Sequence, residues 1–335
     1  DHGVQLEAAV NQFYQGLVDG GRPNADSSWQ YSGTADYTLK LDTGKAGLWP
    51  GGFLEVHGQT FFGDPASLRS GALLPTNVNY ALSAPYGDGT YLPHVTMVQF
   101  LNEKFALVGG KINTAVGDPN AFTPSGVGLD SFMNMSFAFN PVPVHVSPYS
   151  TLAGGFLYMP NEKVTFGFTA FDSDGSMEET GFDTVFNGNT TYVGQLQVKT
   201  NFFERQGTQR LLFMASTKEY TTLDQDARFL LPVGNYEPKT SDESWNASWN
   251  FDQYLTDNWG IFGRIGVSDG EVNLIEQFYS AGIGGTGIIP GRENDRFGVG
   301  WFYAGLSDSF AGAVLDSHEQ GVEIFYDIAV TPWFR

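Results

Sequence analysis

The sequence predicts an all-β protein, a transmembrane antiparallel β-barrel, and three observations carry this prediction. Apolar and polar residues alternate over runs of ten or more positions, as they do in a strand with one apolar face and one polar face. Short and long connecting segments alternate along the chain. The polar face carries charged side chains, whose burial in a protein core costs several kcal/mol each, whereas a water-filled interior removes that cost.

Residues 29–42, WQYSGTADYTLKLD, give the clearest single strand. Apolar or small residues occupy every odd position and polar residues every even position for fourteen residues. Strands of soluble sandwiches are usually about five or six residues long. A strand that crosses a bilayer needs about nine to eleven tilted residues, with aromatic side chains at both interfaces. The length of this strand and its aromatic residues Trp29 and Tyr37 therefore favour a membrane barrel over a soluble β protein.

The same alternation recurs along the chain, in FLEVHGQTFF, TYVGQLQVKTNF, SWNASWNF, NWGIFGRIGV and GVEIFYDIAV. We expect about fourteen strands, which begin near residues 4, 29, 51, 94, 105, 149, 163, 190, 209, 244, 259, 278, 296 and 320. No composition break divides the chain, so residues 1–335 are expected to form a single barrel domain. No amphipathic helix longer than a turn or two is expected.

The connecting segments are of two kinds. The short ones are DTGKAG, LNEK, PNEK, FERQG, LTDN and TPW, and the long ones are residues 63–93, 114–148, 173–189 and 221–243. A structureless loop as long as 114–148 is unusual unless it is functional. Its prolines and phenylalanines suit a loop that folds into the barrel and narrows it, and the alternative is an exterior loop that caps the rim. The expected constriction residues are Asp118, Phe122, Asp130, Phe132 and Asn134.

Composition excludes several classes of partner. The chain has 17 basic and 37 acidic residues, a net charge of −20, which argues against nucleic acid or an acidic membrane surface as a partner. A solvated acidic surface explains this charge, and so does an interior that favours cations. The chain has no cysteine and therefore no disulfide. No run of 18 apolar residues predicts a transmembrane helix, and the start at Asp1 lacks a leader, so any signal peptide is expected to have been removed or never to have existed.

The motifs that carry chemistry are weak. GIGGTG at residues 282–287 fits G-x-G-x-x-G, but Pro290 and a turn follow it where a dinucleotide site needs a helix. The closest two of the five histidines are 37 residues apart, and DSDG at residues 172–175 lacks the other ligands of a calcium loop. Counting alone does not exclude a pair of glycosidase carboxylates, but nothing singles two out. We therefore predict no enzyme, no catalytic residue, no cofactor and no metal.

Strand parity selects the side chains that are expected to line a water-filled channel. They are Asp36, Lys40, Glu55, His57, Gln59, Lys111, Asn113, Gln197, Lys199, Arg264, Glu323 and Asp327. Lys111 and Asn113 lie in GKIN, directly before the long loop, and are best placed near a constriction. A one-residue bulge reverses the assignment of a whole strand.

Several stretches resemble the carbohydrate-selective porin family (OprB type) of Gram-negative outer membranes. They are GLWPGGFLEVHGQTFFG, VGGKIN, FMNMSF, WGIFGRIGVSDG, GIIPGRENDRFGVGWFYAGLSD and EQGVEIFYDIAVTPWF. The resemblance covers nearly the whole chain and is densest over residues 259–334. It implies a sixteen-stranded barrel in the outer membrane of a Gram-negative bacterium, among lipopolysaccharide and phospholipid. It also implies passive transport of small sugars, typically glucose.

The sequence departs from this family in two respects. Family members usually continue beyond the TPW turn with two more strands and a terminal aromatic residue, whereas this chain stops at Arg335. Fourteen strands plus two would give sixteen, so truncation is one expectation and a genuine fourteen-stranded barrel is the other. Family constrictions are also associated with arginines near the second long loop, and here LPTNVNYALSAP has only Arg69 nearby. The preferred sugar is therefore left open.

Three functions remain after these observations. The first is a sugar-selective porin, and the second is a general diffusion porin with a preference for cations. The third is a soluble secreted β protein that binds or hydrolyses carbohydrate. Solute entry into liposomes and channel recordings separate the first two, and resistance to detergent unfolding separates both from the third. The sequence does not decide whether copies of the chain associate, and a homo-oligomer is kept as an alternative.

Overall fold

The computed structural model describes residues 2–21, 29–81, 87–123, 131–185, 187–225, 237–242, 244–311 and 317–335. Its main feature is one antiparallel sheet of fourteen strands. These strands are β1 (Val4–Gln15), β2 (Gln30–Asp42), β3 (Gly52–Gly63), β4 (Gly89–Asn102), β5 (Phe105–Asn113), β6 (Ser150–Asn161), β7 (Val164–Asp172), β8 (Thr190–Phe202), β9 (Arg205–Ser216), β12 (Ser244–Tyr254), β13 (Trp259–Ser268), β14 (Ile275–Thr286), β15 (Arg296–Leu306) and β16 (His318–Asp327).

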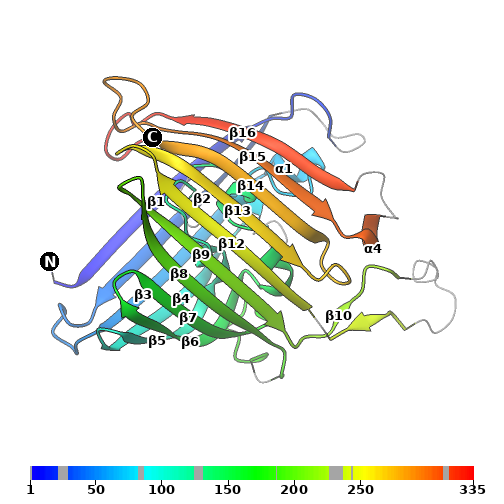
Figure 1. The fold of residues 1–335 in the computed structure, drawn as a ribbon, viewed down its shortest axis with the longest axis horizontal. Helices are drawn as coiled ribbons and strands as arrows, with labels where there is room; N and C mark the ends of the chain where they lie inside the picture. The colour runs from blue at the N-terminus through cyan, green and yellow to red at the C-terminus, as the bar shows by residue number, and fades with distance from the viewer. Residues whose placement is uncertain are drawn as a thin grey trace.

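Each strand pairs with the strands that precede and follow it in this series (Figure 1). The predicted all-β fold and the predicted number of strands are confirmed. The largest difference in a strand start is at β4, which begins at Gly89 instead of near residue 94. A small hairpin of β10 (Tyr220–Thr221) and β11 (Thr240–Ser241), which was not predicted, interrupts the series between β9 and β12.

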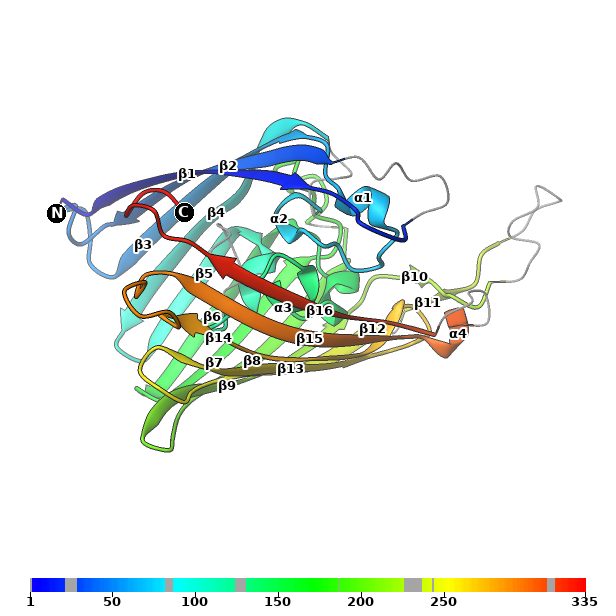
Figure 2. The same ribbon diagram turned by 90° about the horizontal axis from the view of Figure 1, so that it is seen from above.

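The helices of the described residues are single turns. They are α1 (Ser67–Ser70), α2 (Val78–Ala81), α3 (Met135–Ala138) and α4 (Asp308–Ala311), with the 3-10 turns η1 (Thr114–Gly117) and η2 (Val142–Val146). None of the helices in the described part of the chain is long and apolar enough to cross a membrane. Figure 2 shows α2 and α3 enclosed by the curved sheet, so these turns belong to the interior of the barrel.

The sheet curls around this interior, and its first and last strands are β1 and β16. Both chain ends lie at the end of the barrel where the turns are short (Figure 1). The hydrogen-bonded order of the described strands begins at β1 and ends at β16, so each of these two strands has one neighbour in the sheet. Within the described residues, the two end strands are not paired with one another, although the sheet curves around the interior (Figure 2).

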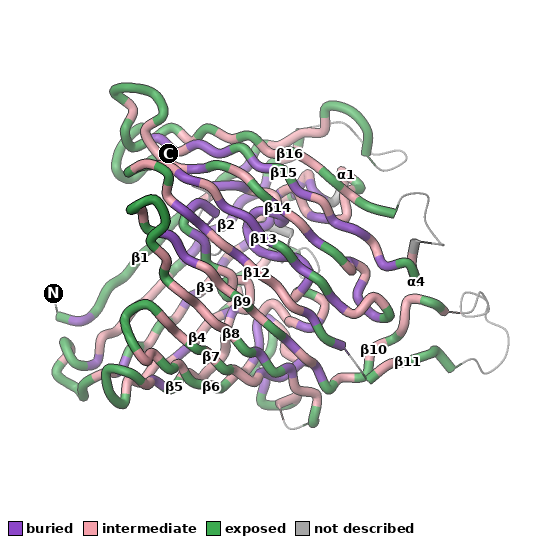
Figure 3. Tube along the Cα trace, viewed as in Figure 1, coloured by how far each residue is buried: buried purple, intermediate pink, exposed green. Residues whose placement is uncertain are grey.

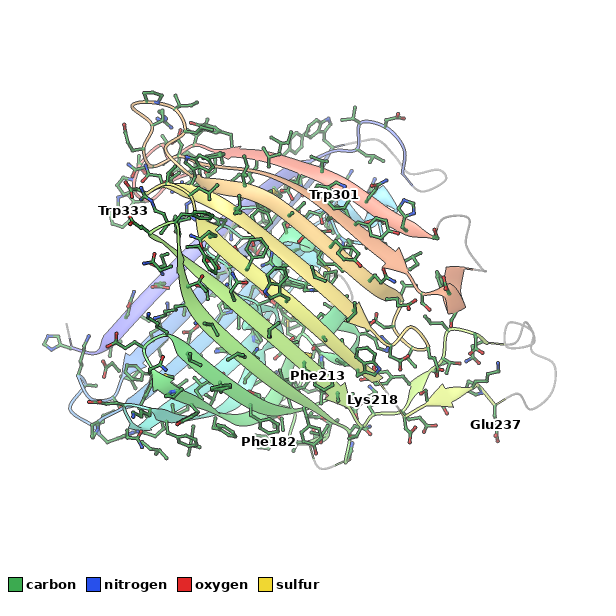
Figure 4. The ribbon with its side chains drawn as sticks, in the orientation of Figure 1. Phe182, Phe213, Lys218, Glu237, Trp301 and Trp333 are labelled. Carbon is green, nitrogen blue, oxygen red and sulfur yellow. The ribbon has the colours of Figure 1, made fainter. Side chains whose placement is uncertain are left out.

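The two faces of the strands differ as the sequence predicts. Apolar side chains such as Val10 and Ile324 are exposed on the outer face, and Ile324 is 73% exposed. Phe213 and Trp301, which Figure 4 labels, also belong to this exposed apolar set. Buried and exposed positions alternate along many strands in Figure 3. An exposed apolar band around a barrel is the surface that contacts lipid. The strands are long because each of them crosses this band.

Candidate functional site: the interior of the barrel

The described parts of the connection from β5 to β6, residues 114–123 and 131–149, pack against the inner face of the opposite wall. Phe132 and Phe137 are buried in a cluster with Phe262, Phe302 and Phe325 of strands β13, β15 and β16. Phe132 forms edge-on contacts with Phe262 at 5.3 Å and with Phe325 at 4.9 Å between ring centroids. Aromatic pairs at these distances favour such geometry. This segment therefore has an apolar core of its own inside the barrel.

Glycine residues on the inner face of the wall make room for this core. A Cβ atom built on Gly300 would lie 2.5 Å from the Phe137 ring, and one built on Gly298 would lie 2.6 Å from the Phe132 ring. Real Cβ atoms essentially never approach this closely. The stretch RFGVGW, residues 296–301, thus presents glycine where the ring of a loop residue reaches the strand backbone.

Arg264 of β13 fixes the same segment by charge and hydrogen bonding. Its Nε lies 2.7 Å from Asp118 Oδ2, and its Nη1 donates to Thr123 Oγ1 at 2.8 Å and to the Phe137 carbonyl at 2.7 Å. Arg264 is 1% exposed. A buried arginine of this kind requires a partner charge and several acceptors, and the loop supplies all of them.

Asparagine side chains extend this polar contact along β12 and β13. Asn120 Nδ2 donates to Asn250 Oδ1 at 2.7 Å, and Asn140 Nδ2 donates to the Ile265 carbonyl at 3.1 Å. Asn250 in turn donates to Asp118. The loop is therefore held to β12 and β13 at several points, and the contacts lie on the inner face of the sheet.

A second segment, residues 64–88 between β3 and β4, joins the first inside the barrel. The Val78 amide donates to the Met133 carbonyl at 2.8 Å, and the Met135 amide donates to the Pro75 carbonyl at 2.9 Å. Leu74 and Val78 are buried in the same cluster as the loop phenylalanines. The described parts of the two connections thus form one packed unit, which we call the inner loops.

The inner face of β1–β5 is polar, and a cavity of about 580 Å³ lies against it. The polar side chains that line this cavity are Gln5, Lys40, Asp42, Lys45, Glu55, His57, His94, Thr96 and Asn113. His57 Nε2 lies 3.0 Å from Asp36 Oδ1, and Asn11 Nδ2 donates to the other oxygen of Asp36 at 3.2 Å. The side chains of this wall therefore hold one another in fixed positions beside the cavity.

Tyr149 connects this polar wall to the inner loops. Its hydroxyl donates to Gln59 Oε1 at 2.9 Å and accepts from Asn113 Nδ2 at 3.1 Å. Burial raises the pKa of Tyr149 far above its ordinary value, which keeps the hydroxyl protonated and able to donate. Gln59 and Asn113 thus have defined orientations next to the cavity.

Several of the predicted channel residues come together on this wall. Lys40, Glu55, His57 and Asn113 line the cavity, and Lys40 pairs with Glu7 at 3.1 Å. The remaining predicted members of the wall are Asp36 and Gln59, which are buried behind it. Whether these residues contact a solute in transit stays a prediction.

The other predicted residues lie elsewhere in the barrel. Gln197 Oε1 on β8 accepts from Arg210 Nε at 3.3 Å, and Lys199 is exposed further along the same strand. Asp327 pairs with Arg335 at 2.6 Å at the end with short turns. The structure does not bring these three residues to the cavity beside β1–β5.

Three predicted positions need correction. The side chains of Arg264 and Glu323 were expected to face water, but Arg264 is enclosed by the inner loops and Glu323 accepts hydrogen bonds from the Met133 and Asn134 amides. Lys111 was expected on the face of Asn113. It pairs instead with Val95 and Leu152, and its Nζ donates to the Met177 and Glu179 carbonyls.

The reason for the error at Lys111 is local. Asn113 is the last residue of β5, and its side chain caps η1 by accepting from the Ala115 amide at 3.0 Å. The chain leaves strand geometry at that point, so the faces of Lys111 and Asn113 do not follow strict alternation. Lys111 consequently belongs with residues 173–189 and not with the cavity.

The predicted constriction residues lie mostly in the inner loops. Asp118 binds Arg264, while Phe122 packs against Tyr254 in a tilted arrangement at 4.8 Å between centroids. Phe132 is buried, and Asn134 caps α3 by accepting from the Ser136 amide at 2.9 Å. Asp130 lies outside the described residues. The width that these residues leave for a solute stays a prediction.

The sequence-based prediction missed Tyr149, His94 and Glu319. Tyr149 directly precedes β6 and so lies outside the alternating pattern, whereas His94 lies within β4, opposite His57 and beside a register shift in the β3–β4 pairing. Glu319 alternates in step with Glu323 on β16, so parity alone was a sufficient signal for it. No group of three or more histidine and acidic side chains within the described residues is arranged to hold a metal ion.

Comparison with known proteins agrees with this architecture. A family model described as carbohydrate-selective porin, OprB family, matches residues 26–335. No curated protein matches the sequence. Among solved structures, OprB of Pseudomonas putida at high pH is similar with a TM-score of 0.81 at 16% identity, over 98% of this chain and 86% of that one. The channel DcaP of Acinetobacter baumannii is similar with a TM-score of 0.52 at 10% identity, over 98% and 88%.

Proposed function

Because the chain belongs to the carbohydrate-selective porin family and is an outer-membrane channel for small carbohydrates, we propose that its solutes pass along the inner face of β1–β5. The observation that carries this proposal is the unequal filling of the barrel. The inner loops pack against β12–β16, and the cavity of about 580 Å³ lies against β1–β5. The fold and the family are those of a channel and not of an enzyme.

The chemistry of this wall suits a sugar such as glucose. Lys40, Glu55 and His94 offer donors and acceptors that replace water on sugar hydroxyls. Phe53 lies in the same lining and is 43% exposed, with Phe100 packed edge-on against it at 5.8 Å. An exposed ring gives the apolar face of a pyranose a surface to stack on. Such contacts are individually weak, which a channel needs if the solute is to leave again.

The inner loops set the narrowest part of the path in this proposal. The support is that the described parts of this segment, residues 114–123 and 131–149, reach from β5 to the opposite wall and are fixed there by Arg264 and Asn250. Asn113 and Tyr149, at the two ends of this segment, lie next to the cavity wall. A solute that follows β1–β5 therefore passes the loop on its polar side.

Thiol modification tests the proposed path, because the chain has no cysteine of its own. We expect a charged thiol reagent to react with Gln5→Cys in the cavity and to reduce both ion conductance and glucose entry into liposomes. Ser280→Cys, on the inner face of β14 and buried, is the matched control and should react slowly. Rapid reaction and block at position 280 with none at position 5 would place the path on the other wall.

General diffusion of small solutes with a preference for cations is the second candidate function. It is favoured by the net charge of −20. Liposome swelling with sugars of equal size separates the two candidates, since a sugar-selective channel ranks stereoisomers differently and a general pore does not. Association of copies of the chain and contacts with particular lipids stay predictions, which cross-linking in the native membrane tests.

A further inference from the structure

Two carboxylates on the inner face of β16 bind the two inner loops in the same manner. Glu319 accepts from the amides of Leu73 at 2.5 Å and of Leu74 at 3.1 Å. Glu323 accepts from the amides of Met133 at 2.7 Å and of Asn134 at 3.0 Å. Each carboxylate thus receives a pair of consecutive backbone N–H groups, one pair from each loop.

We propose that Glu319 and Glu323 are positioning residues that hold the inner loops as one unit and so determine the width of the channel. This inference rests on the proposed function only in assuming that the inner loops border the solute path. It assigns to β16 a task beyond forming the barrel wall. The two residues do not contact the solute in this proposal but act through the backbone of the loops.

The geometry explains why both residues are carboxylates. Two successive N–H groups that point the same way need two acceptor atoms side by side, and a carboxylate supplies them at the reach of one side chain. Charge makes these hydrogen bonds shorter and stronger than those between neutral groups. An amide side chain in the same place would present one oxygen and one NH₂ group, and the NH₂ group would face a second donor.

The neighbouring strand leaves room for the loops to approach. Glu323 lies opposite Gly300 in β15, and Glu319 lies opposite Ala304. The two carboxylates are four residues apart on one strand, which places them about 13 Å apart at the usual rise of a strand. Because side chains alternate along a strand, residues four positions apart lie on the same face, here the interior one. Each carboxylate contacts a different loop.

The loops are also joined to each other, so the two carboxylates act on a shared unit. The hydrogen bonds between Val78 and Met133 and between Met135 and Pro75 connect the segments just beyond the bound amides. Leu74, Val78 and Met135 pack in one cluster. Displacement of either loop from β16 must therefore disturb the other one.

Single-channel recording of Glu319→Gln, Glu323→Gln and the double variant tests the proposal. We expect each single variant to raise the conductance and the noise of the open channel, because the released loop moves away from its docked position. The fold-increase in conductance of the double variant should be larger than that of either single variant. It should be smaller than the product of the two single fold-increases, since either substitution loosens the shared unit. Folding is verified first by the mobility shift on heating. Glu323→Asp, which keeps the charge but shortens the reach, should also raise the noise.

Glu271→Gln is the matched control. Glu271 is exposed in the connection 269–274 at the same end of the barrel, and its loss removes one negative charge without touching the inner loops. Loss of charge alone lowers the conductance of cations. If the conductance of the Glu319 and Glu323 variants fell as much as that of Glu271→Gln, the proposal would be overturned. Unchanged conductance and noise in folded protein would overturn it as well. If the wild-type protein conducts ions and the variants respond as expected but no sugar enters liposomes, the sugar path is wrong while the positioning role stands.

Discussion

Arg264 shows how a single side chain can organise the interior of a barrel. Its guanidinium makes six hydrogen bonds, and all of them go to residues 118–138 of one loop. Four of the six acceptors are backbone carbonyls, so the arginine fixes the path of the loop as well as one carboxylate. A charged residue on the polar face of a strand is therefore no guarantee of contact with water.

Replacing Arg264 by methionine should release the loop and destabilise the protein. The substitution leaves Asp118 as a partly buried charge without its partner, and breaking such pairs costs roughly 3–5 kcal/mol. The free energy of unfolding in urea measures this cost, and single-channel conductance should rise in the protein that remains folded. Arg205→Met is the control, because Arg205 pairs with Asp257 at an exposed turn, where a pair contributes about 0–1 kcal/mol. A similar loss of unfolding free energy at both positions would contradict the role of Arg264 in fixing the loop.

At the scale of elements, β13–β15 form a wall whose inner face is shaped to receive the loop. Glycines on these strands lie under loop side chains, with Gly266 beneath Asn140 and Gly300 beneath Phe137. Glycine weakens an ordinary strand, since it adds no side chain to the packing. Here the missing side chain is replaced by a ring from the loop, so the wall and the loop complete one another.

Gly300→Ala should therefore cost more than an alanine substitution elsewhere in the sheet. Its Cβ would lie 2.5 Å from the Phe137 ring, and overpacking of this kind typically costs about 1–3 kcal/mol. Gly154→Ala on β6 is the control, because no atom lies within 4 Å of a Cβ built there. Unfolding in urea gives the comparison. Equal stability of the two variants would show that the ring of Phe137 can shift without cost.

At the scale of the whole molecule, charge is concentrated at one end. The described residues of the connections at the end with long loops include 15 acidic and 3 basic residues, a net charge of −12. Glu237, at the far right of Figure 4, marks this end, and Trp333 marks the opposite end with short turns. The acidic field therefore lies at the mouth that a solute enters from outside, according to the usual orientation of outer-membrane barrels.

This field should make the channel prefer cations to anions. We expect a reversal potential of the cation-selective sign across a salt gradient, and it should decrease at high salt because screening acts within about 8 Å at physiological ionic strength. Neutralising Glu178, Glu179 and Glu237 should reduce the potential more than neutralising Glu103, Glu162 and Glu204 at the short turns. Anion preference, or equal effects of the two triple variants, would mean that the channel lining decides selectivity instead.

Alternation of side chains predicted most of the fold, because a strand with lipid on one face and water on the other is marked at every residue. The same rule selected Lys40, Glu55 and His57, which lie together along one cavity, and their contact with a solute stays a prediction. It failed where a second influence acts on a side chain. Arg264 and Glu323 are paired with loop atoms 146 and 190 residues away, and no local pattern encodes such a partner.

The contacts that fix the inner loops have a consequence for the order of folding. Neighbouring strands follow one another in the chain, so hairpins close short segments and form early. The bonds from Glu319 to Leu73 and from Arg264 to Asp118 join residues 246 and 146 positions apart. Bringing such distant residues together costs more chain entropy, and here it also requires that β13 and β16 already be in place. We therefore expect a newly formed molecule to pass through a stage in which the wall is built and the passage is at its widest, before the loops bind to it.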